Sequence, residues 1–195
     1  MDDSYFYSRV DEYWMTYSSP VLGVRLGDQP YGASLLTVSS SYGRGAGLDF
    51  KSMARGKWAM GGFQVKNRFS SDNWKDEGLY LQHNLGEDSW VRLNITRSEE
   101  DSTSPPGPGT VDSIWSLEAR LVPGEDSSIE MEYAKCDTDR TGGEDDDDAY
   151  RFLWQGMTAG RISYAFSKIR AGADFWGYYH SYDYESGALS FPLGS

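Results

Sequence analysis

The chain has no apolar run long enough for a transmembrane helix and no helical periodicity that would suggest an α/β protein. Among its 195 residues is a single cysteine, Cys136, which excludes an internal disulfide. Its two histidines, His83 and His180, have no patterned serine, cysteine or metal partner close in the sequence. These absences predict an all-β chain that is not an enzyme and that backbone ladders hold together.

Clustered basic residues are also missing. The net charge of -12 argues against a nucleic-acid partner, because phosphate contacts need grouped lysines and arginines. The charge is uneven, since residues 137–148 contain seven acids against one arginine. Such a segment repels itself, so we expect a long exposed loop at 137–148. A second long exposed loop is expected at 99–112, where prolines and glycines gather.

Side chains alternate with period two along several segments, as in a sheet whose two faces differ. An apolar row interleaves with a polar row in residues 115–121, and residues 129–134 and 150–155 repeat the pattern. In a transmembrane barrel the apolar row faces lipid and the polar row faces the lumen. The side chains predicted to line such a lumen are Ser116, Glu118, Arg120, Glu130 and Glu132.

Connections between the strand-like runs alternate between short turns and long polar loops, which is typical of transmembrane β-barrels. The runs are about ten residues long, the span that a tilted strand needs to cross a bilayer. We therefore predict that residues 1–195 form one antiparallel up-and-down transmembrane β-barrel of roughly ten strands, or a large fragment of one. Aromatic residues gather at the ends of the runs, as in interfacial girdles: Tyr5, Phe6, Tyr7, Tyr13, Trp14, Tyr17, Trp90, Tyr150, Trp154, Phe175, Trp176, Tyr178 and Tyr179.

A soluble β-sandwich or jelly roll is the alternative fold, with the apolar row facing a core. On that alternative, Trp154 and Trp176 would offer a platform for a carbohydrate-binding module. Glu130 and Glu132 could form a carboxylate pair of the glycosidase kind, because they alternate onto one face. Lumen-lining charge is the simpler interpretation of these two residues.

The C-terminal part of the chain is less regular. Short connections are expected at 156–160 and 167–170. An outer-membrane protein must be exported, yet no signal peptide precedes Tyr5, so its leader would have been removed or lies outside this sequence. The last residues do not end in an aromatic side chain, as closing barrel strands usually do, and the chain therefore reads as stopping in mid-barrel.

Leu26-Gly27-Asp28 is followed by Arg44-Gly45-Ala46 and then by Leu48-Asp49. These residues resemble the early barrel region of fimbrial outer-membrane ushers, where a strand ending in Leu-Gly-Asp precedes Arg-Gly-Ala and an acidic segment. The resemblance covers residues 24–50 and implies a large barrel that passes folded pilus subunits outward. The acidic segment with Met and Pro that follows in ushers is absent here, and no stretch reads as their plug domain.

Gly43, Gly45 and Gly47 stand at alternate positions of the same segment. No helical pattern follows them, so a phosphate-binding loop is not expected. We interpret them as small residues that let a barrel strand bend or leave room for a plug or loop.

The acidic segment also matches most positions of a calcium-binding loop. Asp137, Asp139, Asp145 and Asp148 fall at positions 1, 3, 9 and 12, with a threonine and a glycine between them at positions 5 and 6. The last position holds Asp instead of the longer Glu, and strands flank the segment where helices would be needed. A Ca²⁺ loop and a solvated acidic loop both stay open, and no other cofactor is expected.

These features together predict a protein of a Gram-negative outer membrane, surrounded by lipid. Its barrel would form a pore or an assembly and secretion channel, porin-like or usher-like in activity. The cargo would be small solutes or secreted protein subunits.

Overall fold

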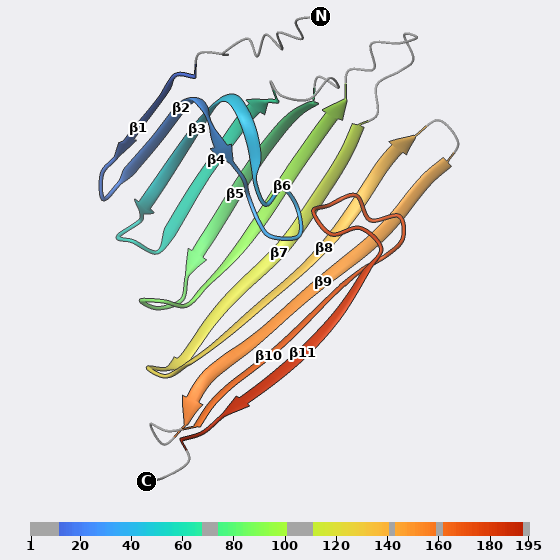
Figure 1. Cartoon of the computed structure of the whole chain (residues 1–195). Helices are drawn as coiled ribbons and strands as arrows, with labels where there is room; N and C mark the ends of the chain where they lie inside the picture. Colours follow the sequence, from blue (N-terminus) through green and yellow to red (C-terminus); the bar gives the residue numbers. More distant parts are fainter. Residues whose placement is uncertain (1–11, 68–73, 101–110, 141–142, 159–161, 193–195) are drawn as a thin grey trace, which may run out of the picture.

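The structure, a computed structural model, describes residues 12–67, 74–100, 111–140, 143–158 and 162–192. They form one antiparallel sheet in which every strand pairs with its neighbours in the sequence (Figure 1). The strands are β1 (Trp14–Ser18), β2 (Leu22–Tyr31), β3 (Ser41–Met53), β4 (Trp58–Lys66), β5 (Trp74–Asn84), β6 (Trp90–Glu100), β7 (Val111–Gly124), β8 (Ser127–Arg140), β9 (Gly143–Thr158), β10 (Ile162–Ala171) and β11 (Tyr182–Ser190).

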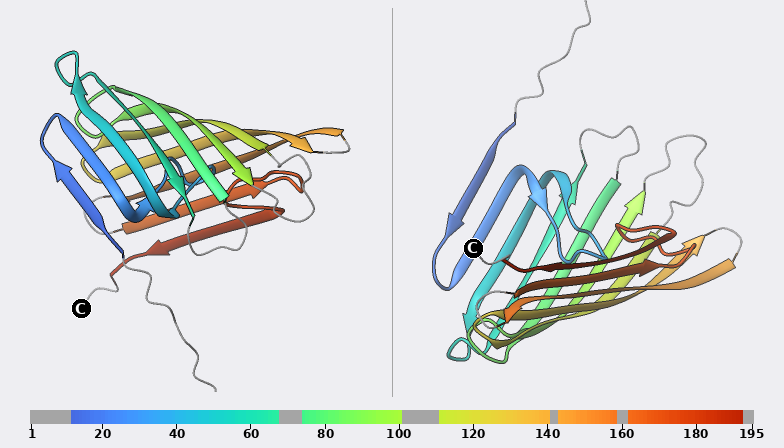
Figure 2. Two further views of the ribbon diagram at one scale, coloured as in Figure 1. Left: turned by 90° about the horizontal axis from the view of Figure 1, so that it is seen from above. Right: turned by 60° about the horizontal axis from the view of Figure 1, so that its bottom comes forward.

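The up-and-down order confirms the predicted all-β antiparallel architecture. A single sheet lacks the two packed layers of a sandwich or jelly roll, so that alternative is wrong. Figure 2 shows the sheet curling around one face, and no ladder between β1 and β11 closes it in the described residues. No helix in the described part of the chain has the length and apolar character needed to cross a bilayer.

Strand β7 shows how the two faces differ. Trp115 and Leu117 are 42% and 50% exposed, whereas Ser116 between them is fully buried. Leu117 lies opposite Leu93 on β6 and Tyr133 on β8, so the apolar row continues across the sheet. We call the exposed apolar side chains of the convex face the outer belt: Leu48, Met60, Leu79, Leu81, Leu93, Ile95, Trp115, Leu117, Met131, Tyr133 and Trp154.

Aromatic residues at strand ends are only partly as expected. Tryptophan is the first residue of β1, β4, β5 and β6. The aromatic residues of 175–179 do not lie at a strand end. They belong to a loop that folds over the sheet, and Phe175 is fully buried. Burying that ring removes it from water entirely, which an interfacial position would not do.

Two segments expected to be connections are strands. β8 continues to Arg140 and β9 begins at Gly143, so most of 137–148 is a paired ladder instead of a long loop. Segment 167–170 lies inside β10. Pairing with neighbouring strands overrides the weak strand preference of Asp, Ser and Lys in both places. In the expected loop at 99–112, β6 and β7 include the ends, and residues 101–110 lie outside the described residues.

The usher-like residues pair with each other across β2 and β3. Asp28 lies opposite Arg44, whose guanidinium donates to its buried carboxylate at 3.0 Å. The ring of Tyr31 lies over Gly45 and Gly47, where an added Cβ would come within 3.0 and 3.4 Å of it. The alternate glycines therefore make room for an aromatic side chain of the neighbouring strand.

Two connections fold back over the concave face, as both views in Figure 2 show. We name residues 32–40, between β2 and β3, the strap, and residues 172–181, between β10 and β11, the inner loop. Leu36 of the strap and Phe175 of the inner loop are both fully buried. They form the main core with side chains of β7–β10: Ile114, Ala134, Cys136, Ala149, Ile169 and Ala171.

A smaller core fixes the start of the strap. Tyr31, Phe63 and Val65 are buried together, and Ala33 and Val38 of the strap pack against them. The strap thus reaches across the concave face from the smaller core, where Ala33 and Val38 pack, to the main core, where Leu36 is buried. All of this buried apolar surface lies on the concave side of the sheet.

Candidate functional site

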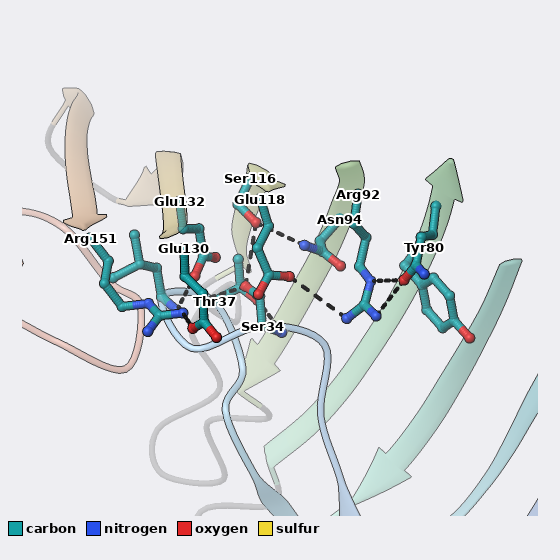
Figure 3. A network of polar contacts seen from close by, with 12 residues as sticks. Ser34, Thr37, Tyr80, Arg92, Asn94, Ser116, Glu118, Glu130, Glu132 and Arg151 are labelled. Carbon is teal, nitrogen blue, oxygen red and sulfur yellow. Dashed lines mark hydrogen bonds and ion pairs between the residues drawn. The ribbon is translucent and has the colours of Figure 1, made fainter. Parts of the chain in front are cut away.

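The concave face of β5–β9 carries a network of polar and charged side chains beneath the strap (Figure 3). Strand alternation places every second residue on this face. Ion pairs and hydrogen bonds link the side chains from strand to strand. The network is the main candidate site of the molecule because it brings the ion pairs of three arginines together on the concave face.

Arg92 on β6 lies between aromatic rings and polar partners. Its guanidinium is 4.6 Å from the ring centre of Trp90 and 5.0 Å from that of Tyr80. It donates to the side-chain oxygen of Gln82 at 2.9 and 2.6 Å and lies 3.6 Å from the Glu118 carboxylate. Ring contacts and charge-assisted hydrogen bonds together fix the position of this cation.

Glu130 on β8 binds arginines from both neighbouring strands. Arg120 on β7 donates to Oε1 at 2.9 Å, and Arg151 on β9 donates to Oε2 at 2.8 Å. The two arginines differ in exposure, with 41% for the Arg120 side chain and 11% for that of Arg151. Both carboxylate oxygens of Glu130 are engaged, which leaves it poorly suited to a glycosidase-like role with Glu132.

Glu132 connects the network to the strap. Its side chain is 2% exposed, and Oε2 accepts a hydrogen bond from the Leu36 backbone N–H at 3.3 Å. The Ser34 hydroxyl lies 3.3 Å from that of Ser116, which also accepts a hydrogen bond from the Asn94 amide at 3.1 Å. The strap is therefore attached to the polar network at two points, on β7 and on β8.

Two hollows lie at opposite ends of this surface. One of about 510 Å³, at the short-turn end, is lined in part by Arg120, Ser128 and Gln155. Another of about 270 Å³ lies between the strap, the inner loop and the strand ends that carry Asp76 and Ser98. Polar side chains line both hollows, so either could hold water and a small polar molecule.

The five residues predicted to line a polar face do lie together on the concave face. Arg120 is opposite Glu130 and Glu118 is opposite Glu132, with Ser116 one step further along β7. Arg92 and Arg151 were missed as their partners, although both stand in polar rows of alternating segments. The strap gave no such signal, because its contacts are distant in the sequence and follow no periodicity.

The expected calcium ligands are divided between two paired strands. Asp137 lies on β8 and Asp148 on β9, opposite Lys135, while the side chains of Asp139 and Asp145 lie outside the described residues. Within the described residues, no group of three or more His, Cys, Asp or Glu side chains is placed to hold a metal ion. A paired hairpin spreads carboxylates along two faces, whereas a calcium loop wraps them around one ion.

The aromatic platform proposed for carbohydrate is also not assembled. Trp154 is on the convex face beside Tyr164, whereas Trp176 belongs to the inner loop on the concave side, beside His180. Cys136 is fully buried in the main core, on the concave face. A thiol in apolar surroundings is a weak nucleophile, which gives Cys136 a packing role.

Comparisons of the chain with protein-family models, with curated proteins and with solved structures find no match. The resemblance of residues 24–50 to ushers thus stays a prediction. The function has to be inferred from the two chemically different faces of the sheet.

Proposed function

We propose that the chain forms the wall of a β-barrel in a bacterial outer membrane and that this barrel is a passage for small polar solutes. The outer belt is the observation that carries the proposal. Leu79, Ile95 and Leu117, on three adjacent strands, are 66%, 53% and 50% exposed. A soluble protein rarely leaves so wide an apolar surface in water, whereas lipid would cover it.

Strand length is consistent with a membrane span. Strands β2–β11 have 9 to 16 residues each. A tilted transmembrane strand needs about 9–11 residues, whereas soluble strands commonly have about five or six. Of the tryptophans that begin strands, Trp58 shares the convex row of Met60 and would lie near lipid headgroups, whereas the Trp90 ring packs against Arg92 on the concave face.

The concave face supports passage of small polar solutes. It carries the ion pairs of Arg92, Arg120 and Arg151 with their carboxylates, which would line a wet lumen. The hollows of about 510 and 270 Å³ have the size of small-molecule sites. We therefore favour solutes over the subunits that the usher resemblance implies.

The direction of the edge strands limits how such a barrel closes. β1 and β11 run in the same direction, because ten antiparallel pairings separate them. A direct β1–β11 seam would be parallel, and a seam to a second copy rotated about the membrane normal would be parallel too. A barrel that is antiparallel throughout therefore needs an odd number of strands besides these eleven.

The test is a pair of identical substitutions at two exposed leucines. Leu117 is near the middle of β7 and 50% exposed, and Leu85 is in a short turn and 55% exposed. In a bilayer, Leu117→Arg should cost about 2–4 kcal/mol and Leu85→Arg about 0–1 kcal/mol, because the charge at position 117 would lie in hydrocarbon. Reversible urea unfolding in lipid vesicles measures both.

Purification with and without detergent is the companion measurement. We expect a folded, monodisperse protein only in detergent or lipid, judged by light scattering and circular dichroism. A folded monomer in plain buffer, with equal small effects of the two leucine variants, would contradict the membrane location.

A further inference from the structure

The strap and the inner loop meet over the long-loop end of the concave face. The backbone N–H of Tyr178 lies 3.2 and 3.1 Å from the carbonyl oxygens of Leu36 and Thr37. Leu36 and Phe175 share the main core beneath this contact. We call the two segments together the inner plug, since they lie over the same strands as the polar network.

The inner plug lies between the two hollows. The hollow of about 270 Å³ is bounded by Thr37, Trp176 and Tyr178 of the plug and by strand ends near the long loops. The hollow of about 510 Å³ is at the opposite, short-turn end of the sheet. A solute that moved along the concave face from one hollow to the other would meet the plug on its way.

Attachment of the plug leaves buried oxygens without partners. Oε1 of Glu132 and Oδ1 of Asn94 are both buried and accept no hydrogen bond. Their residues are 2% and 0% exposed. A buried acceptor without a donor is costly, and the cost is larger for a carboxylate. Lifting the strap would let water reach both oxygens and would offset part of the lost packing of Leu36.

We propose that the inner plug is a removable closure of the passage, latched by the contacts of Leu36 and Ser34 with β7 and β8. This inference rests on the proposed function, because a closure needs a passage to close. With the strap in place, the concave face is covered at Glu132 and Ser116. With the strap lifted, the concave side chains of β6, from Arg92 through Asn94 and Thr96 to Ser98, would form an uncovered polar path toward the smaller hollow.

A reversible covalent lock tests the latch. Ser34→Cys and Ser116→Cys are combined in a Cys136→Ala background, because the two serine hydroxyls are 3.3 Å apart and the new thiols would lie close to each other. The full chain is inserted into planar bilayers and its conductance is recorded before and after reduction. Oxidation should remove opening events, and reduction should restore them.

An unlatched variant gives the opposite change. Leu36 is fully buried and its neighbour Leu35 is 38% exposed in the same strap. Leu36→Ala should raise the time-averaged conductance about tenfold, which corresponds to about 1.4 kcal/mol of lost latch free energy. Leu35→Ala is the matched control and should leave the conductance unchanged. Circular dichroism confirms that both variants keep their sheet.

The outcomes separate the two proposals. If the inserted wild-type protein, the reduced lock and Leu36→Ala all fail to conduct, the proposed passage itself is wrong. If the wild-type protein conducts and neither the oxidised lock nor Leu36→Ala changes the current, the passage stands and the removable plug is overturned.

Discussion

The concave face has two sections on the same three strands, and they differ in chemistry. Under the inner plug, the covered section presents Ile114, Cys136 and Ala149, all at most 4% exposed. A few residues further along β7, β8 and β9, the open section presents Arg120, Glu130 and Arg151. One face of one sheet is thus a dry apolar core at one end and an ion-pair network at the other.

Strand alternation decides which residues share a face of the sheet. Whether a section of that face is apolar or charged depends on which other segments cover it. The covered section is apolar because Leu36 and Phe175 remove it from water. The open section keeps its charges because water still reaches it and every arginine has a carboxylate partner. Glu132 lies at the boundary between the two sections, because it accepts a hydrogen bond from the strap and lies opposite Glu118 of the polar network.

The largest effect is expected from a substitution in the covered section. Phe175→Ala should lower the free energy of unfolding by about 3–5 kcal/mol, because a fully buried ring is lost from a core of small side chains. Tyr178→Ala, at a 63% exposed ring of the same inner loop, should change it by about 0.5 kcal/mol or less. Urea unfolding in detergent measures both. Equal losses would mean that the inner loop is not packed on the sheet as described.

The second prediction separates buried from exposed charge within the open section. Arg151 and Arg120 donate to the same carboxylate at 2.8 and 2.9 Å, but their side chains are 11% and 41% exposed. Arg151→Met should cost about 1–3 kcal/mol, because it leaves part of a buried carboxylate unpaired, and Arg120→Met about 0–1 kcal/mol.

The same two substitutions in a Glu130→Gln background provide the control. Removing the shared carboxylate charge should shrink the difference between Arg151→Met and Arg120→Met, as expected for coupled neighbours. Identical costs in both backgrounds would show that burial does not strengthen the Arg151 ion pair. Urea unfolding in detergent again gives the four values.

Much of the sheet was predictable from the sequence because period two is a local signal. The alternation in 115–121 predicts that Ser116, Glu118 and Arg120 share one face, and the ladder with β8 agrees. The alternate glycines of β3 predicted a strand bend or room for a plug or loop, whereas the space at Gly45 and Gly47 holds the ring of Tyr31 from the paired strand β2.

Tertiary contacts were not predictable in this way. Residues 137–148 read as a solvated loop because their acidic side chains repel one another, yet cross-strand pairing extends β8 and β9 through most of them. The inward fold of the strap depends on contacts such as Leu36 with Glu132, which lie 96 residues apart. Phe175 gave the same sequence signal as a girdle aromatic, because composition alone does not tell a buried ring from an interfacial one.

The smallest expected effect concerns the boundary between the two sections, at Tyr179 of the inner loop. Burial against the main core raises the pKa of the Tyr179 hydroxyl, and the neighbouring Tyr178 and Tyr182 add to the rise. A raised pKa means that the folded state holds this proton more tightly than the unfolded chain. The resulting stability is fully present below the unfolded pKa of about 10 and is lost as the pH rises through the folded value.

Tyr179→Phe removes the titrating group and keeps the ring. The variant should therefore lose less stability than the wild-type protein between about pH 8 and about pH 11, the interval that brackets an ordinary tyrosine pKa. Tyr178→Phe, at the exposed neighbour, controls for the loss of one hydroxyl. Urea unfolding in detergent at both pH values measures the difference. If Tyr179→Phe and the wild-type protein lose the same amount, Tyr179 is not held against the core, and the covered section ends at Phe175.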